Sequence, residues 1–330
     1  MTPEALDHKL RTISDHEALY RQGIKNIRTD SFPRIMLHGR KVMRFSYADI
    51  SAENDGIPFL VKKHSRFQDY PEHIHDWVEL SFLYSGKCIQ ILDGERYEMQ
   101  EGQVLMTSPG TVHTLEPLGE NDILVQIAIG HRNLDHIFFN RSSTAGIVTS
   151  FLLDAFVSKA RPEAFYIFAT ETSRRMRVFI TEFLCEWFEP SPVSYNILND
   201  LFSLIISELV NALHITSEHA ERTHKGGYIF PALRYIEDNY RTCTLQDTAE
   251  ELGLQPNYLS AILKKYTGYS FISLVQKKKL TVAEKLLQNS EMSVTDIAHY
   301  VGYQNISFFY RIFKEKNHCL PGDFRNMTQI

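Results

Sequence analysis

Two stretches near the C-terminus repeat one pattern, and this repeat constrains the fold more than any other feature of the 330-residue chain. Each stretch has an apolar start, an alanine four residues later and a glycine four residues after that: Leu245, Ala249 and Gly253 in one, and Val294, Ala298 and Gly302 in the other. In a helix-turn-helix the small alanine lets the first helix approach the second closely, and the glycine adopts a left-handed conformation in which a Cβ would clash. The repeat therefore predicts two helix-turn-helix motifs, the alternative being two ordinary hairpins of a helical bundle.

A second predicted helix follows each glycine. Its apolar stripe and the lysine after it are again repeated: Leu259, Ile262, Leu263 and Lys264 in one motif, and Phe309, Ile312, Phe313 and Lys314 in the other. Val275 to Asn289 has a helical pattern and connects the two motifs. We therefore expect one all-α domain that contains both motifs.

At these residues the chain resembles the AraC/XylS family of bacterial transcription regulators, closely over residues 228–326 and more loosely before them. The family signature is present as Gly302-Tyr303, Phe309, Arg311, Phe313-Lys314, Pro321 to Arg325 and, in the connecting helix, Lys279 to Ala283 with Leu286-Leu287. Lys279 stands where the family usually has Arg, and Leu263 where Phe is usual, so charge and apolarity are kept. The resemblance implies a transcription regulator that binds double-stranded DNA.

In a helix-turn-helix the second helix enters the major groove, and exposed residues near its N-terminus reach base edges. By their match to family positions, the expected DNA contacts are Asn257, Ser260 and Ala261, with Tyr258 and Lys264 near phosphates, in the first motif, and Ser307, Phe308, Tyr310 and Arg311, with Lys314 near the backbone, in the second. An Arg fork can bond a guanine edge bidentately, so Arg311 is the main candidate for base reading. A salt bridge to Glu315 is the alternative role for Arg311. Because many members have Arg where this chain has Ala261, the first motif is expected to act mostly as an anchor.

Charge is unevenly distributed along the chain. Residues 228–330 hold 12 Lys and Arg against 10 Asp and Glu, a net charge of +2, whereas the remainder carries −7. This contrast favours a polyanionic partner for the C-terminal part, recognised through placed charges instead of bulk basicity. The length exceeds what one core usually fills, so two or three domains are expected.

The cysteines and the N-terminus predict a cytoplasmic protein. The scattered cysteines have no paired spacing and are expected to be free thiols: Cys88, Cys185, Cys243 and Cys319. Charged residues occupy the N-terminus where a signal peptide needs an apolar core, and no apolar run reaches membrane-spanning length. We expect no membrane partner.

Residues from about 34 to 129 form short alternating runs typical of strands. The predicted strands are Trp77 to Tyr84, Lys87 to Leu92, Tyr97 to Gln100, Val104 to Thr107 and Ile123 to Ile129. Asp93-Gly94 is a hairpin turn sequence, and many short strands between such turns indicate a small barrel or jelly roll. Residues 3–28 have helical spacing, with a capping-box pattern at Ser14 to Glu17, and are expected to form a strap on this barrel.

His73, His75 and Glu79, followed by His113, resemble the two cupin motifs, with Ser108 where the pattern has Pro. We expect His73, His75 and Glu79 to alternate onto one strand face, and imidazoles with a carboxylate suit Fe, Mn or Zn. AraC-like regulators with a cupin-type domain commonly use the barrel to hold a small molecule without catalysis. The resemblance thus implies an effector site at His73, His75, Trp77, Glu79, Ser81 and His113, with Trp77 at its rim and with no metal or cofactor. Polar groups on an apolar wall suit a small polar ligand such as a sugar.

Residues 131–222 change to helical periodicity. Ser173 to Phe188 and Val193 to Ile215, separated by Glu189 to Pro192, predict an antiparallel helical hairpin. A stripe near heptad spacing lies on the second helix: Leu198, Leu201, Phe202, Ile205 and Leu209. It fits either packing on the barrel or a dimer seam. The polar residues 218–227 are expected to be a hinge.

These patterns and the resemblance together predict an α+β multidomain protein. We expect a cupin-like sensory barrel with its strap over residues 1–130, a helical dimerisation region over 131–222 and a DNA-binding domain over 228–330. The expected function is that of a homodimeric, sequence-specific regulator controlled by a small effector, with RNA polymerase as a further candidate partner and without enzymatic activity. A metal-dependent cupin enzyme fused to a helical domain is the alternative, but an enzyme does not need the doubled motif. A constitutive architectural DNA binder would leave the barrel unexplained.

Overall fold

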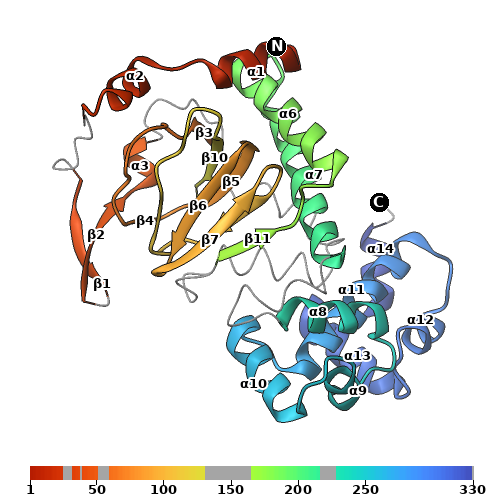
Figure 1. Cartoon of the computed structure of the whole chain (residues 1–330). Helices are drawn as coiled ribbons and strands as arrows, with labels where there is room; N and C mark the ends of the chain where they lie inside the picture. Colours follow the sequence, from red (N-terminus) through yellow and green to blue (C-terminus); the bar gives the residue numbers. More distant parts are fainter. Residues whose placement is uncertain (25–31, 38, 51–58, 131–164, 216–227, 329–330) are drawn as a thin grey trace. The chain divides into compact units, whose positions relative to one another are not determined.

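Figure 1 shows the computed structural model of the chain, which describes residues 1–24, 32–37, 39–50, 59–130, 165–215 and 228–328. The described residues form two compact units, one before residue 216 and one after residue 227. The first unit is rich in strands and the second is helical, which confirms the predicted α+β class. The predicted hinge at residues 218–227 and the part of the helical prediction over 131–164 lie outside the described residues. Within the described residues, no helix combines the length and apolarity required to cross a membrane.

Two sheets face each other in the first unit. The six-stranded sheet has the order β1 (Arg34–Leu37), β2 (Arg40–Phe45), β4 (His73–His75), β9 (His113–Leu115), β6 (Lys87–Leu92) and β7 (Glu95–Gln100). The five-stranded sheet has the order β11 (Phe165–Phe168), β8 (Val104–Thr107), β5 (Val78–Ser85), β10 (Ile123–Ile129) and β3 (Phe59–Lys63). One core cluster joins Leu83 and Leu105 of the second sheet to Leu92 and Leu115 of the first. The two inner faces therefore share one interior, as in a small barrel.

Local sequence signals predicted most of these strands. The strands at 87–92, 104–107 and 123–129 are confirmed, and the hairpin at Asp93-Gly94 has positive φ angles of 51° and 86°, as its two-residue turn requires. The strand expected at 77–84 begins one residue later. The helical prediction is wrong at Phe165–Phe168, which forms β11 and pairs with β8. This aromatic and β-branched segment suits a strand, but its partner is distant in sequence.

Helices cover the barrel within this unit: α1 (Pro3–Arg11), α2 (Asp15–Arg21), α3 (Tyr47–Ile50), α6 (Arg174–Phe188) and α7 (Ser194–Ile215). The predicted capping box is confirmed at Ser14, whose side chain accepts from the Glu17 amide while the Glu17 carboxylate accepts from the Ser14 amide. Rings of α6 and α7 pack on the barrel, because Phe59 of β3 lies 5.3 Å from Phe183 and 4.9 Å from Phe202. Of the α7 stripe, Leu198, Phe202, Ile205 and Leu209 are buried in this unit. The stripe therefore packs on its own barrel, the first of the two interpretations.

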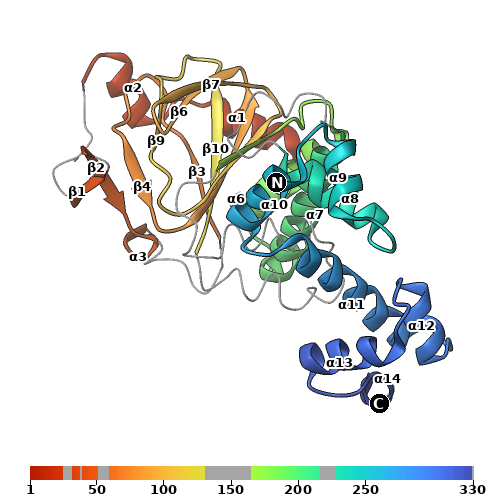
Figure 2. The same cartoon turned by 90° about the horizontal axis from the view of Figure 1, so that it is seen from below.

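The second unit contains both predicted motifs (Figure 2). Its helices are α8 (Ile229–Asn239), α9 (Leu245–Glu251), α10 (Pro256–Thr267), α11 (Phe271–Asn289), α12 (Val294–Tyr300), α13 (Ile306–Asn317) and α14 (Pro321–Thr328). Ala249 and Ala298 are fully buried, and Gly253 and Gly302 have φ angles of 64° and 89°. The structure thus confirms the close approach and the left-handed turn expected in each motif.

Candidate functional sites

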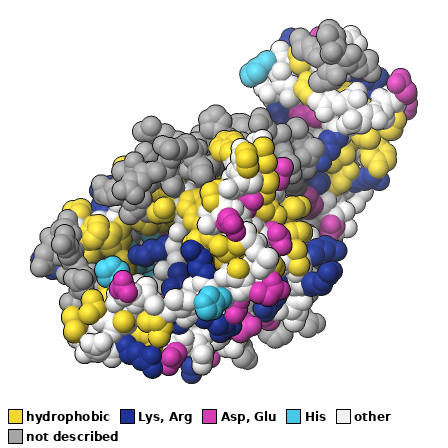
Figure 3. All heavy atoms as spheres, turned by 90° about the horizontal axis from the view of Figure 1, so that it is seen from above, with side chains coloured by type: hydrophobic (Ala, Val, Ile, Leu, Met, Phe, Trp, Pro, Cys, Tyr) yellow, Lys and Arg dark blue, Asp and Glu magenta, His cyan; other side chains and the backbone are white. Residues whose placement is uncertain are grey.

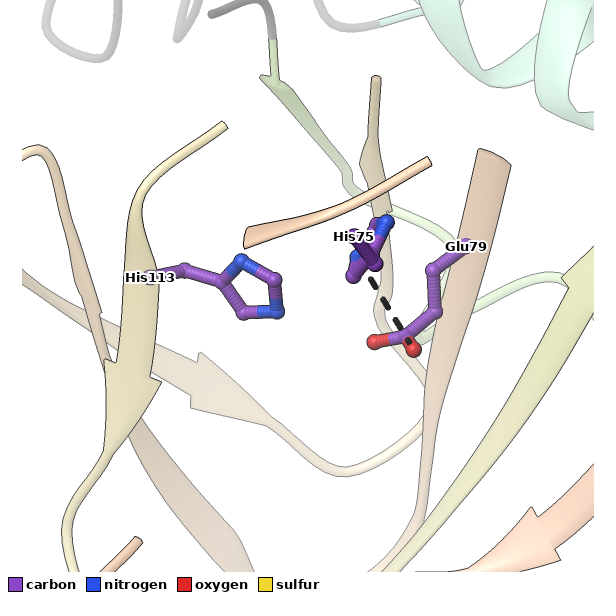
Figure 4. A group of neighbouring side chains, drawn as sticks. All are labelled: His75, Glu79 and His113. Carbon is purple, nitrogen blue, oxygen red and sulfur yellow. Dashed lines mark ion pairs between the residues drawn. The ribbon is translucent and has the colours of Figure 1, made fainter. Parts of the chain in front are cut away.

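The histidine cluster is assembled from both sheets of the barrel (Figure 4). His73 and His75 lie on β4 and His113 on β9 of the six-stranded sheet, whereas Glu79 lies on β5 of the facing sheet. The prediction that His73, His75 and Glu79 share one strand face is therefore wrong. The chain turns from one sheet to the other at Asp76, whose carboxylate accepts from the Ser46 hydroxyl at 2.9 Å and from the Tyr47 amide at 2.6 Å. Facing sheets, not strand alternation, bring the carboxylate to the imidazoles.

Three of these residues converge on one small volume. Ligand-type atoms of His75, Glu79 and His113 all lie within 4.8 Å of one another, and the three side chains are buried. His75 Nε2 is 4.0 Å from Glu79 Oε2 (Figure 4). His73 is opposite His113 in the β4–β9 register, with ring centroids 4.1 Å apart, but it does not belong to this group of three.

Backbone carbonyls orient all three imidazoles in the same way. The Nδ1 atoms of His73, His75 and His113 lie 3.0, 2.8 and 2.9 Å from the carbonyl oxygens of Pro71, Trp77 and Thr111. A carbonyl only accepts, so each Nδ1 carries a proton and donates it. The Nε2 atom of His75 lies 3.5 Å from the Thr107 hydroxyl oxygen. Burial, reinforced by the neighbouring His113, lowers the pKa of His73 and of His75 well below the ordinary value. These two rings are therefore neutral at physiological pH.

The Glu79 carboxylate is held from three directions. Its Oε1 accepts from Gln126 Nε2 at 2.8 Å and from Ser81 Oγ at 3.2 Å, and its Oε2 accepts from Trp77 Nε1 at 3.4 Å. Trp77 stacks on His75 with ring centroids 4.5 Å apart. It is only 6% exposed, so it belongs to the wall of the site and not, as predicted, to its rim.

Sequence reasoning missed several residues of this wall. Gln126 is the one polar residue of the apolar strand Ile123–Ile129, and this was a usable signal. It lies opposite Ser81 on one side and Lys62 on the other, which puts all three on the same face of the sheet. His64 Nδ1 is 3.2 Å from Gln126 Oε1, and burial, with the nearby Lys62 cation, lowers the pKa of His64 to about 4. Lys62 itself is exposed, yet desolvation lowers its pKa, as expected for a side chain at the edge of the interior.

The donor set also fits a transition-metal ion. Metal-binding histidines usually donate their second ring nitrogen to a carbonyl or carboxylate, as His75 and His113 do here. Two imidazoles and a carboxylate suit Zn, Fe or Mn. Moreover, His113 Nε2 is buried without a hydrogen-bond partner among the described residues. A cation or a ligand hydroxyl would satisfy this nitrogen.

In the first helix-turn-helix, α10 presents most of its predicted contacts to solvent. Asn257, Tyr258 and Ala261 are exposed and Ser260 is half-buried. Lys264 is also exposed, but its ammonium donates to the Gly268 carbonyl at 3.0 Å and so caps its own helix. The N-terminal half of α10 is therefore the part best placed to contact a ligand.

In the second motif, α13 divides the predicted residues between surface and core. Ser307, Arg311 and Lys314 are exposed, whereas Phe308 and Tyr310 are half-buried against the motif's core. The Arg311 guanidinium lies 5.1 Å from the centroid of the Phe308 ring. Its contact with Glu315 is 4.0 Å long between side chains that are 66% and 69% exposed. Such an exposed ion pair contributes little to stability, so Arg311 can leave Glu315 to reach a partner.

Basic and acidic side chains are interspersed on the face shown in Figure 3. Such a face carries no broad field of one sign. Residues 228–330 also have nearly balanced charges, with 12 Lys and Arg against 10 Asp and Glu.

Comparisons with known proteins agree with both parts of the chain. A family model described as an AraC-like ligand binding domain matches residues 59–130, and a helix-turn-helix domain model matches residues 248–327. The transcriptional activator RhaS of Mannheimia succiniciproducens is 23% identical over 279 residues, covering 82% of this chain and 95% of that protein. The regulatory protein PocR of Salmonella typhimurium is 34% identical over 98 residues, covering 28% of this chain and 31% of PocR. The solved C-terminal domain of AraT, a response regulator from Geobacillus stearothermophilus, is 31% identical, with a TM-score of 0.30, and the match covers 32% of this chain and 88% of that domain.

The two kinds of match fall on the two parts that the structure separates. The ligand-binding model covers strands β3 to β10, and the helix-turn-helix model runs from α9 to α14. The match to RhaS extends across both. The chain therefore belongs to the AraC/XylS family of transcription regulators and carries an N-terminal ligand-binding domain.

Proposed function

We propose that the barrel binds a small polyhydroxylated effector, such as a sugar, and that this binding controls the DNA affinity of α10 and α13. The observation that carries the proposal is the convergence of His75, His113 and Glu79 from two facing sheets, with His113 Nε2 lacking a partner among the described residues. A buried acceptor without a donor is unfavourable, so a ligand that supplies one is stabilised there.

The chemistry of the wall suits hydroxyl groups. The imidazoles turn Nε2 away from the carbonyls that hold Nδ1, Glu79 offers carboxylate oxygens, and Gln126 offers a further amide. Trp77 adds an aromatic face beside these acceptors. His73 and Ser81 complete the proposed effector set. A sugar has several O–H donors on a compact apolar ring, which matches this mixture.

One specific observation favours a metal ion as the alternative occupant of this site: each imidazole donates its Nδ1 proton to a backbone carbonyl, which leaves Nε2 as the side that could bind a metal. His75, Glu79 and His113 would hold a divalent transition metal, which when bound would supply a Lewis-acidic position for a ligand oxygen. The residues of this chain would then orient the effector around that position. Because its relatives are transcription regulators, we infer a binding role and not an enzymatic one.

For the DNA-binding part, we propose base contacts from Arg311 and Ser307 in α13 and from Asn257 in α10, with phosphate contacts from Tyr258 and Lys314. The exposure of these residues on the second helix of each motif supports the assignment. The remaining members of the predicted set, Ser260, Ala261, Lys264, Phe308 and Tyr310, are proposed to border the DNA.

The proposed division is a barrel with its strap over residues 1–130, a helical region over 131–222 and a DNA-binding domain over 228–330. We further propose a cytoplasmic homodimer, with RNA polymerase as a candidate partner. Leu204 remains exposed on α7 after its stripe is buried, which supports an α7 contact between protomers. Sedimentation analysis tests it, because Leu204→Glu should dissociate the dimer, and an unchanged mass would contradict the contact.

Thermal unfolding of the full chain with a panel of sugars tests the effector. A ligand at roughly a hundredfold excess over its Kd should stabilise the barrel by about 2.7 kcal/mol. Glu79→Gln and His113→Phe should abolish the response, whereas His299→Ala, an exposed histidine of α12, should keep it. If no sugar stabilises the protein and elemental analysis finds one equivalent of Zn, Fe or Mn, the metal alternative replaces the proposal.

A further inference from the structure

The turn of the second helix-turn-helix packs against the loop that precedes the first motif. A Cβ built on Gly302 would lie 2.3 Å from the carbonyl oxygen of Arg241, in the loop that connects α8 and α9. Because this neighbour is backbone, it cannot move aside as a flexible side chain would. Gly253, the equivalent glycine of the first motif, has no atom within 4 Å of such a Cβ. The two glycines share a left-handed backbone, but Gly302 alone of the two packs against a distant backbone segment.

One lysine of the connecting helix joins the same elements. The Lys279 ammonium donates to the Gly302 carbonyl at 2.8 Å and to the Arg241 carbonyl at 3.2 Å. It also lies 5.2 Å from the centroid of the Tyr303 ring. A single cation of α11 therefore links the loop before the first motif to the turn of the second.

Two further contacts hold this loop and the helix before it. The Arg241 guanidinium lies 3.9 Å from the centroid of the Tyr300 ring at the end of α12. Lys278 forms an ion pair of 2.6 Å with Glu237 of α8, and these side chains are only 17% and 18% exposed. Side chains thus attach α8 and its following loop to α11 and to the second motif. Because α8 packs on α9 and α10, these contacts also hold the first motif.

We propose that Arg241, Lys279 and Gly302 form an interlock that fixes the position of α10 relative to α13, and so sets the spacing of the DNA elements that the chain reads. These are positioning residues, since the interlock acts through the recognition helices. Without the interlock, α11 alone would join the motifs. After the first motif has bound DNA, the second would then be held less strictly at one distance from it along the DNA. The proposal rests on the DNA-binding role of the family and is independent of the effector.

The test uses a DNA site selected from random sequence by the native full-length protein, and the same site with one base pair inserted between its two elements. The insertion moves the second element by about 3.4 Å along the axis and rotates it. The native protein should bind the inserted site at least about tenfold more weakly. Gly302→Ala and Lys279→Met should reduce the ratio of the two dissociation constants, inserted site over selected site, to less than about threefold. Motifs that are held less firmly relative to each other tolerate either spacing.

Matched variants separate positioning from folding. Gly253→Ala imposes the same left-handed strain without the contact, and Lys279→Arg retains a cation that can donate to both carbonyls. Both should keep the native ratio, and circular dichroism should show native helix content for Lys279→Met. If Lys279→Met loses affinity for both sites equally, with the ratio unchanged, or if Gly302→Ala behaves like Gly253→Ala, the interlock does not set the spacing.

Discussion

The strap on the barrel depends on one buried carboxylate. Glu17 of α2 is fully buried and accepts from Lys63 Nζ at 2.8 Å, from Arg66 Nε at 2.9 Å and from Arg66 Nη2 at 3.0 Å. The backbone amides of Ser14 and Arg66 also donate to it. Arg66 is itself 1% exposed; its Nη1 donates to the Glu120 carbonyl, and its Nη2 also donates to the carbonyls of Arg11 and Thr12. Glu17→Gln keeps the shape of the side chain but leaves this guanidinium buried without its anion.

The expected loss of folding free energy in Glu17→Gln follows from two independent arguments. Burial of the Glu17 carboxyl raises its pKa, but hydrogen bonds from Arg66 and Lys63 lower it by more, to about 2, against an ordinary value of 4.5. Since one pKa unit corresponds to about 1.4 kcal/mol, the charged form stabilises the fold by about 3 kcal/mol. Removing one partner of a buried ion pair costs about 3 to 5 kcal/mol in other proteins. We therefore expect Glu17→Gln to reduce the free energy of unfolding by about 3 kcal/mol at pH 7.

The pH dependence has a definite sign. The folded-state pKa lies below the unfolded one, so the contribution is fully present above pH 4.5 and is lost as the pH falls towards 2. The variant lacks this titrating group. The difference in stability between native protein and Glu17→Gln should therefore stay constant from pH 7 to about 5 and shrink below that.

Urea unfolding followed by tryptophan fluorescence measures this difference. Both tryptophans of the chain, Trp77 and Trp187, lie in the first unit, so the signal reports the unit that contains the strap. The control is Glu120→Gln, which breaks an exposed ion pair with Arg21 and should cost less than about 1 kcal/mol. A loss below about 1 kcal/mol for Glu17→Gln at pH 7, or one that does not change between pH 7 and 3, would refute the reasoning.

Three further predictions concern DNA and metal. Arg311→Ala should lose about 1 to 3 kcal/mol of binding free energy on the specific site and relax the base preference there, whereas Lys314→Ala should weaken binding to all sequences alike and reduce the slope of log K against log salt concentration by about one. Fluorescence anisotropy titrations at several salt concentrations measure both effects. An unchanged base preference for Arg311→Ala would favour the Glu315 salt bridge. Purified protein should contain well under one equivalent of transition metal by elemental analysis; stoichiometric metal that disappears in His75→Ala would contradict this. The two recognition helices should enter successive major grooves about 34 Å apart, so footprinting with residues 225–330 should show two protected segments, and protection of one alone would exclude a bipartite site.

Local patterns by themselves determined the two helix-turn-helix motifs of this protein. Ala249 and Ala298 had to be small, and Gly253 and Gly302 had to adopt positive φ, because the backbone of a helix-turn-helix imposes both conditions within a few residues. The same holds for the Asp93-Gly94 hairpin, whose turn needs no distant partner. Such short-range requirements are visible in one sequence.

Only the tertiary structure decided what distant segments do together. Glu79 meets His75 and His113 because two sheets face each other, a relation that strand alternation did not predict. Gln126 joins them as the neighbour of Ser81 across a strand pair. Gly302 differs from Gly253 because the Arg241 carbonyl and the Lys279 ammonium pack against it. The repeat makes these two glycines equivalent in sequence, but a contact between residues 61 positions apart arises from the packing of helices and leaves no periodic trace in the chain.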